Sequence, residues 1–353
     1  MGGIEKFNRA FLKALQELPS PPSVRGLSVH DTECNPAYFN PAHYTVAKGN
    51  KLKAILQALL QASQADTIIL GHINLAIIGL LIKWRYPSKK IWLVAHGIDV
   101  WDQQTGVKKR LLQTVDKIIA VSEYTRQTMA ASNAIALDKI NLLHNCIDPY
   151  FHYPTNLQKP AYLVERYHAA GRNILYTLTR LAAGEKYKGY DVVIESLPQL
   201  KEKYPNILYI IGGKADEEER NRVQALIEKH QVQDHVWLTG FIAEEELVDH
   251  YLLADVFVMP SKGEGFGIVF IEAAACGTPV IAGNKDGSVD ALKHGLLGEL
   301  VNPYEPKEIE QAIINSIETR AKGMELARLT HDFFHFDNYR AQLLHILTAG
   351  NHR

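Results

Sequence analysis

The segment from residue 261 to 272, SKGEGFGIVFIE, contains two carboxylates with seven residues between them. Glu264 lies among glycines directly after an apolar run that predicts a buried strand, and Glu272 lies in an apolar stretch that favours a helix. Glycines let a ligand approach the backbone, and the amides at a helix N-terminus favour phosphate. A buried carboxylate such as Glu272 needs partners, which ligand hydroxyls could supply. The segment predicts a site for an anionic, hydroxyl-rich ligand; the alternative is a capping glutamate beside a surface glutamate.

Two basic residues follow an earlier predicted strand. Arg180 comes directly after the run 173–178, and Lys188 lies within the polar segment that precedes the next predicted helix. Cations at the carboxyl end of a strand can neutralise a diphosphate, which is the leaving group when a sugar is transferred from a nucleotide sugar. Fixed positive charges aimed at that developing charge would give electrostatic catalysis. The alternative for each residue alone is a solvated loop.

Short β-branched runs alternate with amphipathic stretches along the whole chain, which is typical of parallel α/β layers. The proline-containing segment Asp148–Ala161 has no periodicity and predicts an interdomain linker. The expected strands are Val24–His30, Thr67–His72, Ile91–His96, Lys117–Ser122, Ile140–Asn145, Asn173–Leu178, Ile207–Gly212, Val236–Phe241, Val256–Pro260 and Pro279–Ala282.

Histidines stand at the ends of several expected strands in the first half of the chain: His30, His72, His96 and His144. In open parallel sheets, ligands bind outside the carboxyl ends of the strands. We expect these residues to share one rim that lines a cleft. For each histidine other than His96, a purely structural role is the alternative.

The length of 353 residues suits two domains, and 46% hydrophobic with 22% charged residues is typical of a globular protein. A net charge of -1 argues against nucleic acid as a partner. Residues 1–150 nevertheless carry about six more basic than acidic residues, and the remainder about seven fewer. Either both surfaces are ordinary, or the first domain meets an anionic membrane surface or lipid-linked acceptor.

The three cysteines, Cys34, Cys146 and Cys276, lie far apart and form no metal-spaced pair, which indicates a reducing compartment. The sequence shows no leader and no apolar run approaching ~18 residues. We therefore expect a cytoplasmic protein with at most peripheral contact with the inner face of a membrane.

With these features in place, the chain resembles the retaining glycosyltransferases of family four. The run PSKGEGFGIVFIEAAACGTPVIAG is similar to the family's glutamate-seven-glutamate motif, and further similar motifs begin at Gly2, His96, Ser122, Asn145 and Gly298. The resemblance implies an α/β GT-B fold, in which two Rossmann-like domains face each other across a cleft. The expected divisions are 1–155 for the acceptor-side domain, 156–330 for the donor domain and 331–353 for a helix that crosses back to the first domain.

The resemblance also implies roles for individual residues. Four residues are expected to be catalytic: His96, Arg180, Lys188 and Glu264. His96 would bind a sugar hydroxyl near the reacting carbon, and Glu264 would bind other hydroxyls of the sugar. The expected donor-binding residues are Gly3 for phosphate, Phe241 and Ile242 for the nucleobase, Gly265, Phe266, Gly267 and Ile268 through their backbone, and Glu272 for the ribose.

No metal and no cofactor are expected beyond the nucleotide-sugar donor. UDP is the preferred nucleotide and glucose the preferred sugar on family frequency, and the acceptor is a glycan or lipid-linked molecule of bacterial polysaccharide biosynthesis. A front-face mechanism is expected, in which the departing phosphate deprotonates the acceptor. The alternatives are a nucleotide-sugar epimerase, a sugar-phosphate synthase, or a non-catalytic module that only binds nucleotide sugar.

Two departures from the family pattern stand out. The family has a strand before its first glycine loop, whereas this sequence begins at Met1 and reaches that loop at Gly3. The first strand of the N-terminal domain is therefore expected to be missing from this sequence: either the natural start lies upstream, or the protein closes the gap in another way. Both alternatives weaken the expectation for Gly3. In addition, Asp290 stands where many relatives have a glutamate.

Overall fold

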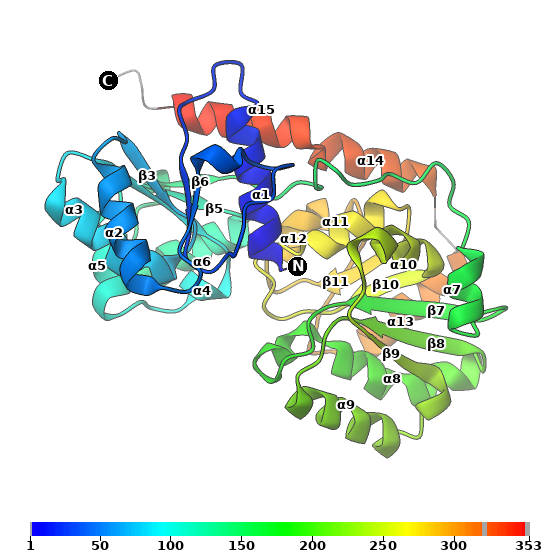
Figure 1. The fold of residues 1–353 in the computed structure, drawn as a ribbon. Helices are drawn as coiled ribbons and strands as arrows, with labels where there is room; N and C mark the ends of the chain where they lie inside the picture. Colours follow the sequence, from blue (N-terminus) through cyan, green and yellow to red (C-terminus); the bar gives the residue numbers. More distant parts are fainter. Residues whose placement is uncertain (1, 320–322, 350–353) are drawn as a thin grey trace. The chain divides into compact units, whose positions relative to one another are not determined.

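The computed structural model describes residues 2–319 and 323–349 of the chain. The chain divides into two compact units (Figure 1). The N-terminal unit comprises Met1–Pro149 together with His335–Arg353, and the C-terminal unit comprises Tyr150–Phe334. The divisions therefore lie at Pro149 and at Phe334, rather than at the expected residues 155 and 330.

The described part of the N-terminal unit contains a four-stranded parallel sheet in the order β3-β4-β5-β6 and a separate parallel pair, β1 and β2. The strands are β1 (Gly26–Ser28), β2 (Tyr44–Val46), β3 (Thr67–Leu70), β4 (Lys90–Ala95), β5 (Lys117–Ala120) and β6 (Ile140–Leu142). The helices are α1 (Gly3–Gln16), α2 (Lys51–Ala62), α3 (Ala76–Arg85), α4 (Ile98–Trp101), α5 (Gly106–Thr114), α6 (Glu123–Asn133) and α15 (Phe336–Thr348).

The first and the last described helices, α1 and α15, meet in this unit. The ring of Phe7 on α1 contacts Tyr339 on α15 edge to face, with 6.2 Å between ring centroids. The Arg340 guanidinium lies 3.4 Å from a carboxylate oxygen of Glu17. Helix α15 thus completes the packing around α1, as the red and blue helices of Figure 1 show.

Gly3 is the first residue of α1, and Gly2 caps that helix in an extended conformation. Within residues 2–25 the structure has no strand, and the first strand it describes is β1. Residues 2 and 3 therefore lie at a helix N-terminus.

The described residues of the C-terminal unit form a six-stranded parallel sheet in the order β12-β11-β10-β7-β8-β9. The strands are β7 (Asn173–Leu178), β8 (Ile207–Gly212), β9 (Val236–Gly240), β10 (Val256–Met259), β11 (Val280–Gly283) and β12 (Glu299–Val301). The helices are α7 (Ala161–Arg166), α8 (Tyr190–Lys203), α9 (Glu217–Lys229), α10 (Leu247–Leu253), α11 (Ile268–Ala275), α12 (Ser288–Ala291), α13 (Pro306–Thr319) and α14 (Met324–Phe334).

The order of this sheet determines where a ligand can bind. The chain runs outward from β7 through β8 to β9, then returns to β10 on the other side of β7 and runs outward to β12. The direction of winding therefore reverses between β7 and β10, and such a switch point opens a crevice at the carboxyl ends of the strands. The segments after β7 and β10 carry the basic residues and the glutamate motif, so the fold brings them together.

Candidate functional site

The loop after β10 is held by the loop between β11 and α12. The backbone N–H of Glu264 donates to Oδ2 of Asp286 at 2.7 Å, and the N–H of Gly287 donates to the carbonyl oxygen of Glu264 at 2.8 Å. A side chain at Gly287 would place its Cβ 2.1 Å from the carbonyl oxygen of Gly265, so only glycine permits this approach. Two backbone segments in contact thus fix the position of Glu264.

Asp286 is buried, and that burial raises the pKa of its carboxyl to about 6, although hydrogen bonds from Ser288 and Glu264 favour the charged form. Its second oxygen accepts the N–H of Ser288 at 2.9 Å. From the segment 286–290, only Asp290 stood out in the sequence, as a departure from the family pattern. In the structure, Asp286 positions the glycine loop.

Gly267 caps the N-terminus of α11 in the left-handed conformation, with φ of 88°. The ring of Phe266 is buried and packs edge to face on Phe334 of α14, with 5.7 Å between ring centroids. Ile268 is also buried. The segment Gly265–Ile268 therefore offers a ligand its backbone rather than its side chains, and the first turn of α11 points its amides outward.

Lys188 and Glu264 form an ion pair, in which Nζ donates to Oε1. The side chains are 14% and 13% exposed. Burial is the largest single influence and lowers the pKa of Lys188, but the charge and hydrogen bond of Glu264, together with Tyr187 and Glu185, leave the pKa raised. The left-handed Gly189 lets the chain pass close to Pro260, where a Cβ would lie 2.3 Å from the carbonyl oxygen. That close approach brings the segment after β7 against the loop after β10.

Arg180 lies outside this pair. Its guanidinium binds the carboxylate of Glu185, five residues along the same segment, and its side chain is 69% exposed. The hydrogen bond that the guanidinium donates to Glu185, and the negative charge of that carboxylate, raise the pKa of Arg180. Arg180 and Lys188, the two residues expected to bind the diphosphate, thus follow the same strand, but each is paired with a different carboxylate.

Glu272 lies on α11 and is 2% exposed. The hydroxyl of Tyr251, on α10, donates to its Oε2 at 2.8 Å. From the sequence, the hydroxyls of a bound ligand were the expected partners of this buried carboxylate. The structure supplies one from within the protein, because helices α10 and α11 pack together.

Phe241 and Ile242 follow β9 and have different surroundings. Phe241 is strongly exposed, whereas Ile242 is buried. A Cβ added to Gly212 at the end of β8 would lie 2.6 Å from a methyl group of Ile242, so this side chain fills the space between the two strand ends. Only Phe241 of the two has a side chain available to a ligand.

In the N-terminal unit, His96 follows β4 and contacts the segment after β3. Its Nε2–H donates to the carbonyl oxygen of Gly71 at 2.8 Å. The ring stacks on His72 with 6.0 Å between centroids, and His72 Nε2 lies 3.8 Å from Oδ2 of Asp99. Because Nε2 is engaged, His96 can accept a hydrogen bond from a ligand only through Nδ1.

The environment of this group favours neutral side chains. Burial lowers the pKa of His96 to about 4, against a smaller opposite effect of the bond to Gly71. Burial likewise raises the pKa of Asp99 to about 6. His30, which we expected on the same rim, follows β1 in the separate strand pair. The prediction of one rim for all four histidines is therefore wrong for His30.

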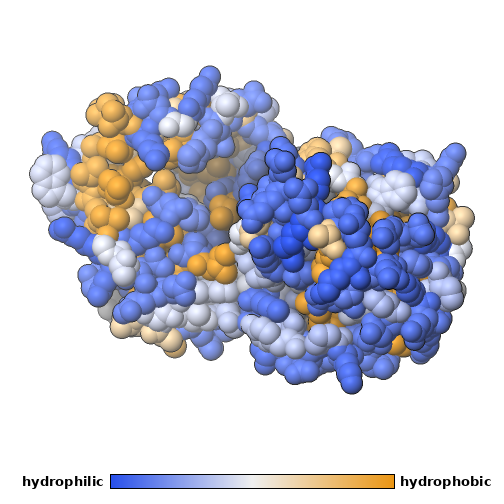
Figure 2. Space-filling model, turned by 90° about the horizontal axis from the view of Figure 1, so that it is seen from below, coloured by the Kyte–Doolittle hydropathy of each residue, from blue (hydrophilic) through white to orange (hydrophobic). Residues whose placement is uncertain are grey.

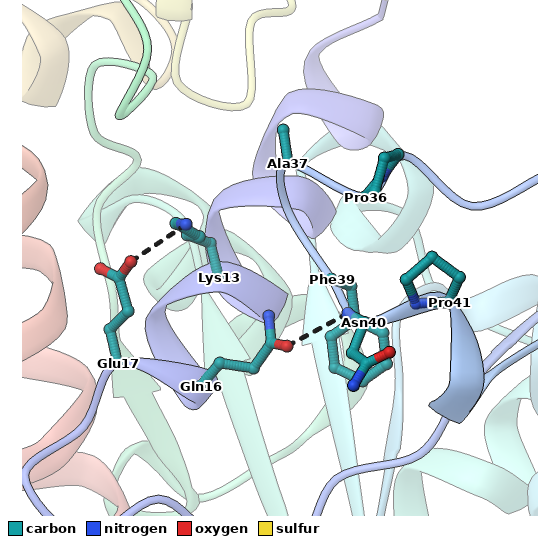
Figure 3. Close-up of a pocket in the computed structure, with 8 residues that line it drawn as sticks. All are labelled: Lys13, Gln16, Glu17, Pro36, Ala37, Phe39, Asn40 and Pro41. Carbon is teal, nitrogen blue, oxygen red and sulfur yellow. Dashed lines mark hydrogen bonds and ion pairs between the residues drawn. The ribbon is translucent and has the colours of Figure 1, made fainter.

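A pocket at the C-terminal end of α1 contains none of the expected site residues (Figure 3). Its polar side chains are engaged by neighbouring side chains or backbone. Lys13 lies 3.1 Å from a carboxylate oxygen of Glu17, and Oε1 of Gln16 accepts the N–H of Asn40 at 3.2 Å. Among the residues the structure describes, no group of three or more His, Cys, Asp or Glu side chains is arranged to hold a metal ion.

Comparison with known proteins identifies the family. The profile described as "Glycosyltransferase Family 4" matches residues 1–151, and "Glycosyl transferases group 1" matches residues 167–329. A GDP-mannose-dependent alpha-(1-6)-phosphatidylinositol monomannoside mannosyltransferase of Mycolicibacterium smegmatis is 31% identical over 271 residues, which are 73% of this chain and 69% of that protein. This chain belongs to glycosyltransferase family 4.

Solved structures show that this family 4 glycosyltransferase has the GT-B fold. The HepE protein of Anabaena in complex with UDP and glucose superposes with a TM-score of 0.80 at 18% identity, covering 99% of this chain and 96% of HepE. Sucrose-phosphate synthase of Thermosynechococcus elongatus gives 0.73 at 20% identity, covering 99% and 93%. At these identities the likeness establishes the fold alone.

The structure of this family 4 protein adds three residues to those that the sequence indicated. Glu185 was visible in the segment after β7, but its pairing with Arg180 was not. Asp286 lies four residues before Asp290, and nothing in the sequence indicated that it binds the backbone of Glu264. Tyr251 gave no signal, because it belongs to another helix and only packing brings it to Glu272.

Proposed function

We propose that this glycosyltransferase transfers a hexose from a nucleotide-sugar donor, UDP-glucose by preference, to a glycan or lipid-linked acceptor in bacterial polysaccharide biosynthesis. The observation that carries the proposal is the contact between Lys188 and Glu264 beside the N-terminus of α11. It joins a cation suited to a diphosphate with a carboxylate suited to sugar hydroxyls. Arg180 is the second cation for the diphosphate, once the phosphate replaces Glu185.

The remaining roles follow the local structure. The backbone of Gly265–Ile268 caps the phosphate and sugar, since its side chains are turned inward or absent. Phe241 flanks the nucleobase with its exposed ring, and Ile242 contributes through its backbone. Glu272 binds the ribose with the carboxylate that Tyr251 orients. Gly3 approaches phosphate through the N-terminus of α1, and His96 accepts a hydrogen bond from a sugar hydroxyl.

The proposed reaction retains the anomeric configuration. The bond between the anomeric carbon and the diphosphate oxygen breaks, and the acceptor hydroxyl oxygen bonds to that carbon from the same face. The acceptor proton passes to the departing phosphate oxygen. Glu264 is bound to Lys188, which supports a binding role rather than a nucleophilic one. The two cations supply the positive charge that the leaving diphosphate needs, so we propose a reaction without a metal.

The identity of the donor has two candidates with support. HepE was solved with UDP and glucose, whereas the mycobacterial mannosyltransferase depends on GDP-mannose. An acceptor that is itself a sugar phosphate is a second candidate function. A mannosylfructose-phosphate synthase of Agrobacterium fabrum is 26% identical over 236 residues.

The test measures the release of UDP from UDP-glucose and of GDP from GDP-mannose. A metal chelator is present, because the proposed reaction needs no metal. The acceptors are lipid extracts, oligosaccharides and hexose phosphates, each compared with no acceptor, and product anomers are assigned by NMR. We expect acceptor-dependent release with retention. Conversion of the donor sugar without an acceptor would indicate an epimerase. Donor binding without turnover under any acceptor would show a non-catalytic module and overturn the proposal.

A further inference from the structure

The helix α2 of the N-terminal unit buries the small side chains and exposes the large ones. Its buried residues are Ala54, Ala58 and Ala62. Leu52, Leu56 and Leu60 follow the same four-residue spacing on another face, with exposed fractions of 75%, 62% and 64%. A helix that only had to cover a core would turn its leucines inward, because leucine gains more from burial than alanine does.

The neighbouring helix α3 extends this exposed apolar surface. It packs beside α2 and exposes Ile77 and Trp84, the latter to 80%. The two are seven positions apart, so they lie on one face of the helix. Figure 2 shows hydrophobic residues gathered on this part of the N-terminal unit. We call these five residues of α2 and α3 the apolar face; exposed apolar patches of this kind mark interaction sites.

Charge distinguishes the partner that this face suits. Residues 48–90 contain a single acidic residue, Asp66, and seven basic ones: Lys48, Lys51, Lys53, Lys83, Arg85, Lys89 and Lys90. Lys83 is paired with Asp116, 3.3 Å away, and the other six carry the positive excess of the segment that bears the apolar face. Exposed leucine and tryptophan, with lysine and arginine close to them in the chain, is the composition of a segment that lies in the interface of an anionic membrane.

We propose that the apolar face docks on an anionic lipid bilayer, with its leucines and Trp84 at the level of the headgroups and the surrounding lysines and arginines against anionic lipid. No helix within the described residues is long and apolar enough to cross a membrane. The contact is peripheral: it removes the apolar side chains from water and places the basic ones in the negative surface potential. This surface goes beyond the proposed reaction, because docking needs neither donor nor acceptor.

The test is co-sedimentation of the full chain with vesicles of phosphatidylcholine alone or mixed with phosphatidylglycerol. We expect binding only to the mixed vesicles, and weaker binding as salt screens the charges. Leu52→Gln/Leu60→Gln should weaken binding about tenfold or more. Its matched control is Leu137→Gln/Leu296→Gln, two exposed leucines outside the face, which should bind as the wild type does.

The charges are tested separately. Lys51→Gln/Arg85→Gln should weaken binding by about fivefold per charge, whereas Lys229→Gln/Lys307→Gln on the C-terminal unit should not. Unfolding and donor-binding measurements on every variant distinguish a lost membrane contact from a lost fold or a failed donor site. Equal binding by the Leu52/Leu60 variant and its control would overturn the proposal. A dimer that dissociates in that variant, with no vesicle binding by wild type, would assign the face to a second copy instead.

Discussion

Lys188 and Glu264 are each the other's buried counter-ion, although 76 positions separate them in the chain. Because strands β7 and β10 are neighbours, the segment after one meets the loop after the other. The pair holds the cation proposed for the diphosphate against the carboxylate proposed for the sugar. The two residues should therefore respond differently to substitution.

Replacing Lys188 by methionine should weaken UDP binding about tenfold or more, because the cation for the phosphates is lost. Replacing Glu264 by glutamine should preserve or increase the affinity for UDP, since Lys188 loses its competing partner, yet lower the transfer rate about a hundredfold. Calorimetric titration with UDP and initial transfer rates measure the two effects. Equal weakening of UDP binding by both substitutions would contradict the assigned roles.

Glu185→Gln should tighten UDP binding several-fold, because Glu185 occupies the Arg180 guanidinium that the diphosphate is proposed to use. The Arg180 side chain is largely exposed, and exposed ion pairs contribute only about 0–1 kcal/mol to stability. The free energy of unfolding should therefore change little. In an Arg180→Ala background, adding Glu185→Gln should give no gain in affinity for UDP. If the gain persisted in this double variant, Arg180 would be excluded as its source.

Tyr251→Phe should lower the free energy of unfolding by about 2 kcal/mol, because buried Glu272 loses a hydrogen-bond donor. Tyr176→Phe is a matched control in the same unit, since its buried hydroxyl has no hydrogen-bond partner among the described residues. Denaturant unfolding of both variants makes the comparison. If the control were destabilised as much as Tyr251→Phe, the loss would reflect general packing rather than support of Glu272.

His96 should make stability depend on pH below neutrality. Its pKa is about 4 in the folded chain, against 6.5 for an ordinary histidine. The unfolded chain therefore binds more protons between these values, so the contribution is complete above pH 6.5 and is lost as the pH falls toward 4. Asp99 acts in the opposite direction over part of this range, because its pKa is raised to about 6.

The difference between wild type and His96→Gln isolates the histidine. We expect the wild type to lose about 2 kcal/mol more than the variant between pH 7 and pH 4.5, measured by denaturant unfolding. Parallel pH profiles for the two proteins would show that His96 is not held neutral by its surroundings.

The sequence predicted strands reliably where apolar runs are long and end at polar residues. Strands β7 and β8 begin and end as expected, because each is a mainly apolar run bounded by polar residues or glycine. Strand β2 was not expected: Tyr44–Val46 is short and partly exposed, and it pairs only with β1. The position of His30 was predicted wrongly for a different reason: the sequence of a strand does not reveal which sheet that strand joins.

The candidate site was predictable in its residue types and not in its pairings. The seven residues between Glu264 and Glu272 identified both as candidate site residues. Their burial differs because Glu264 lies in a loop and Glu272 lies in a helix. Which partners they take depends on strand order and helix packing, which bring Lys188 to Glu264 and Tyr251 to Glu272. These contacts link residues far apart in the chain, and local periodicity does not encode them.

The central claim is that the C-terminal unit binds a nucleotide sugar through Lys188 and the glycine loop. The most direct measurement is the thermal stability of the wild type and Lys188→Met in the presence of UDP-glucose, GDP-mannose and ADP-glucose. At about a hundredfold excess over the dissociation constant, one of these donors should stabilise the wild type by roughly 2.7 kcal/mol and the variant by much less. No stabilisation of the wild type by any of the three, or equal stabilisation of both proteins, would contradict the account.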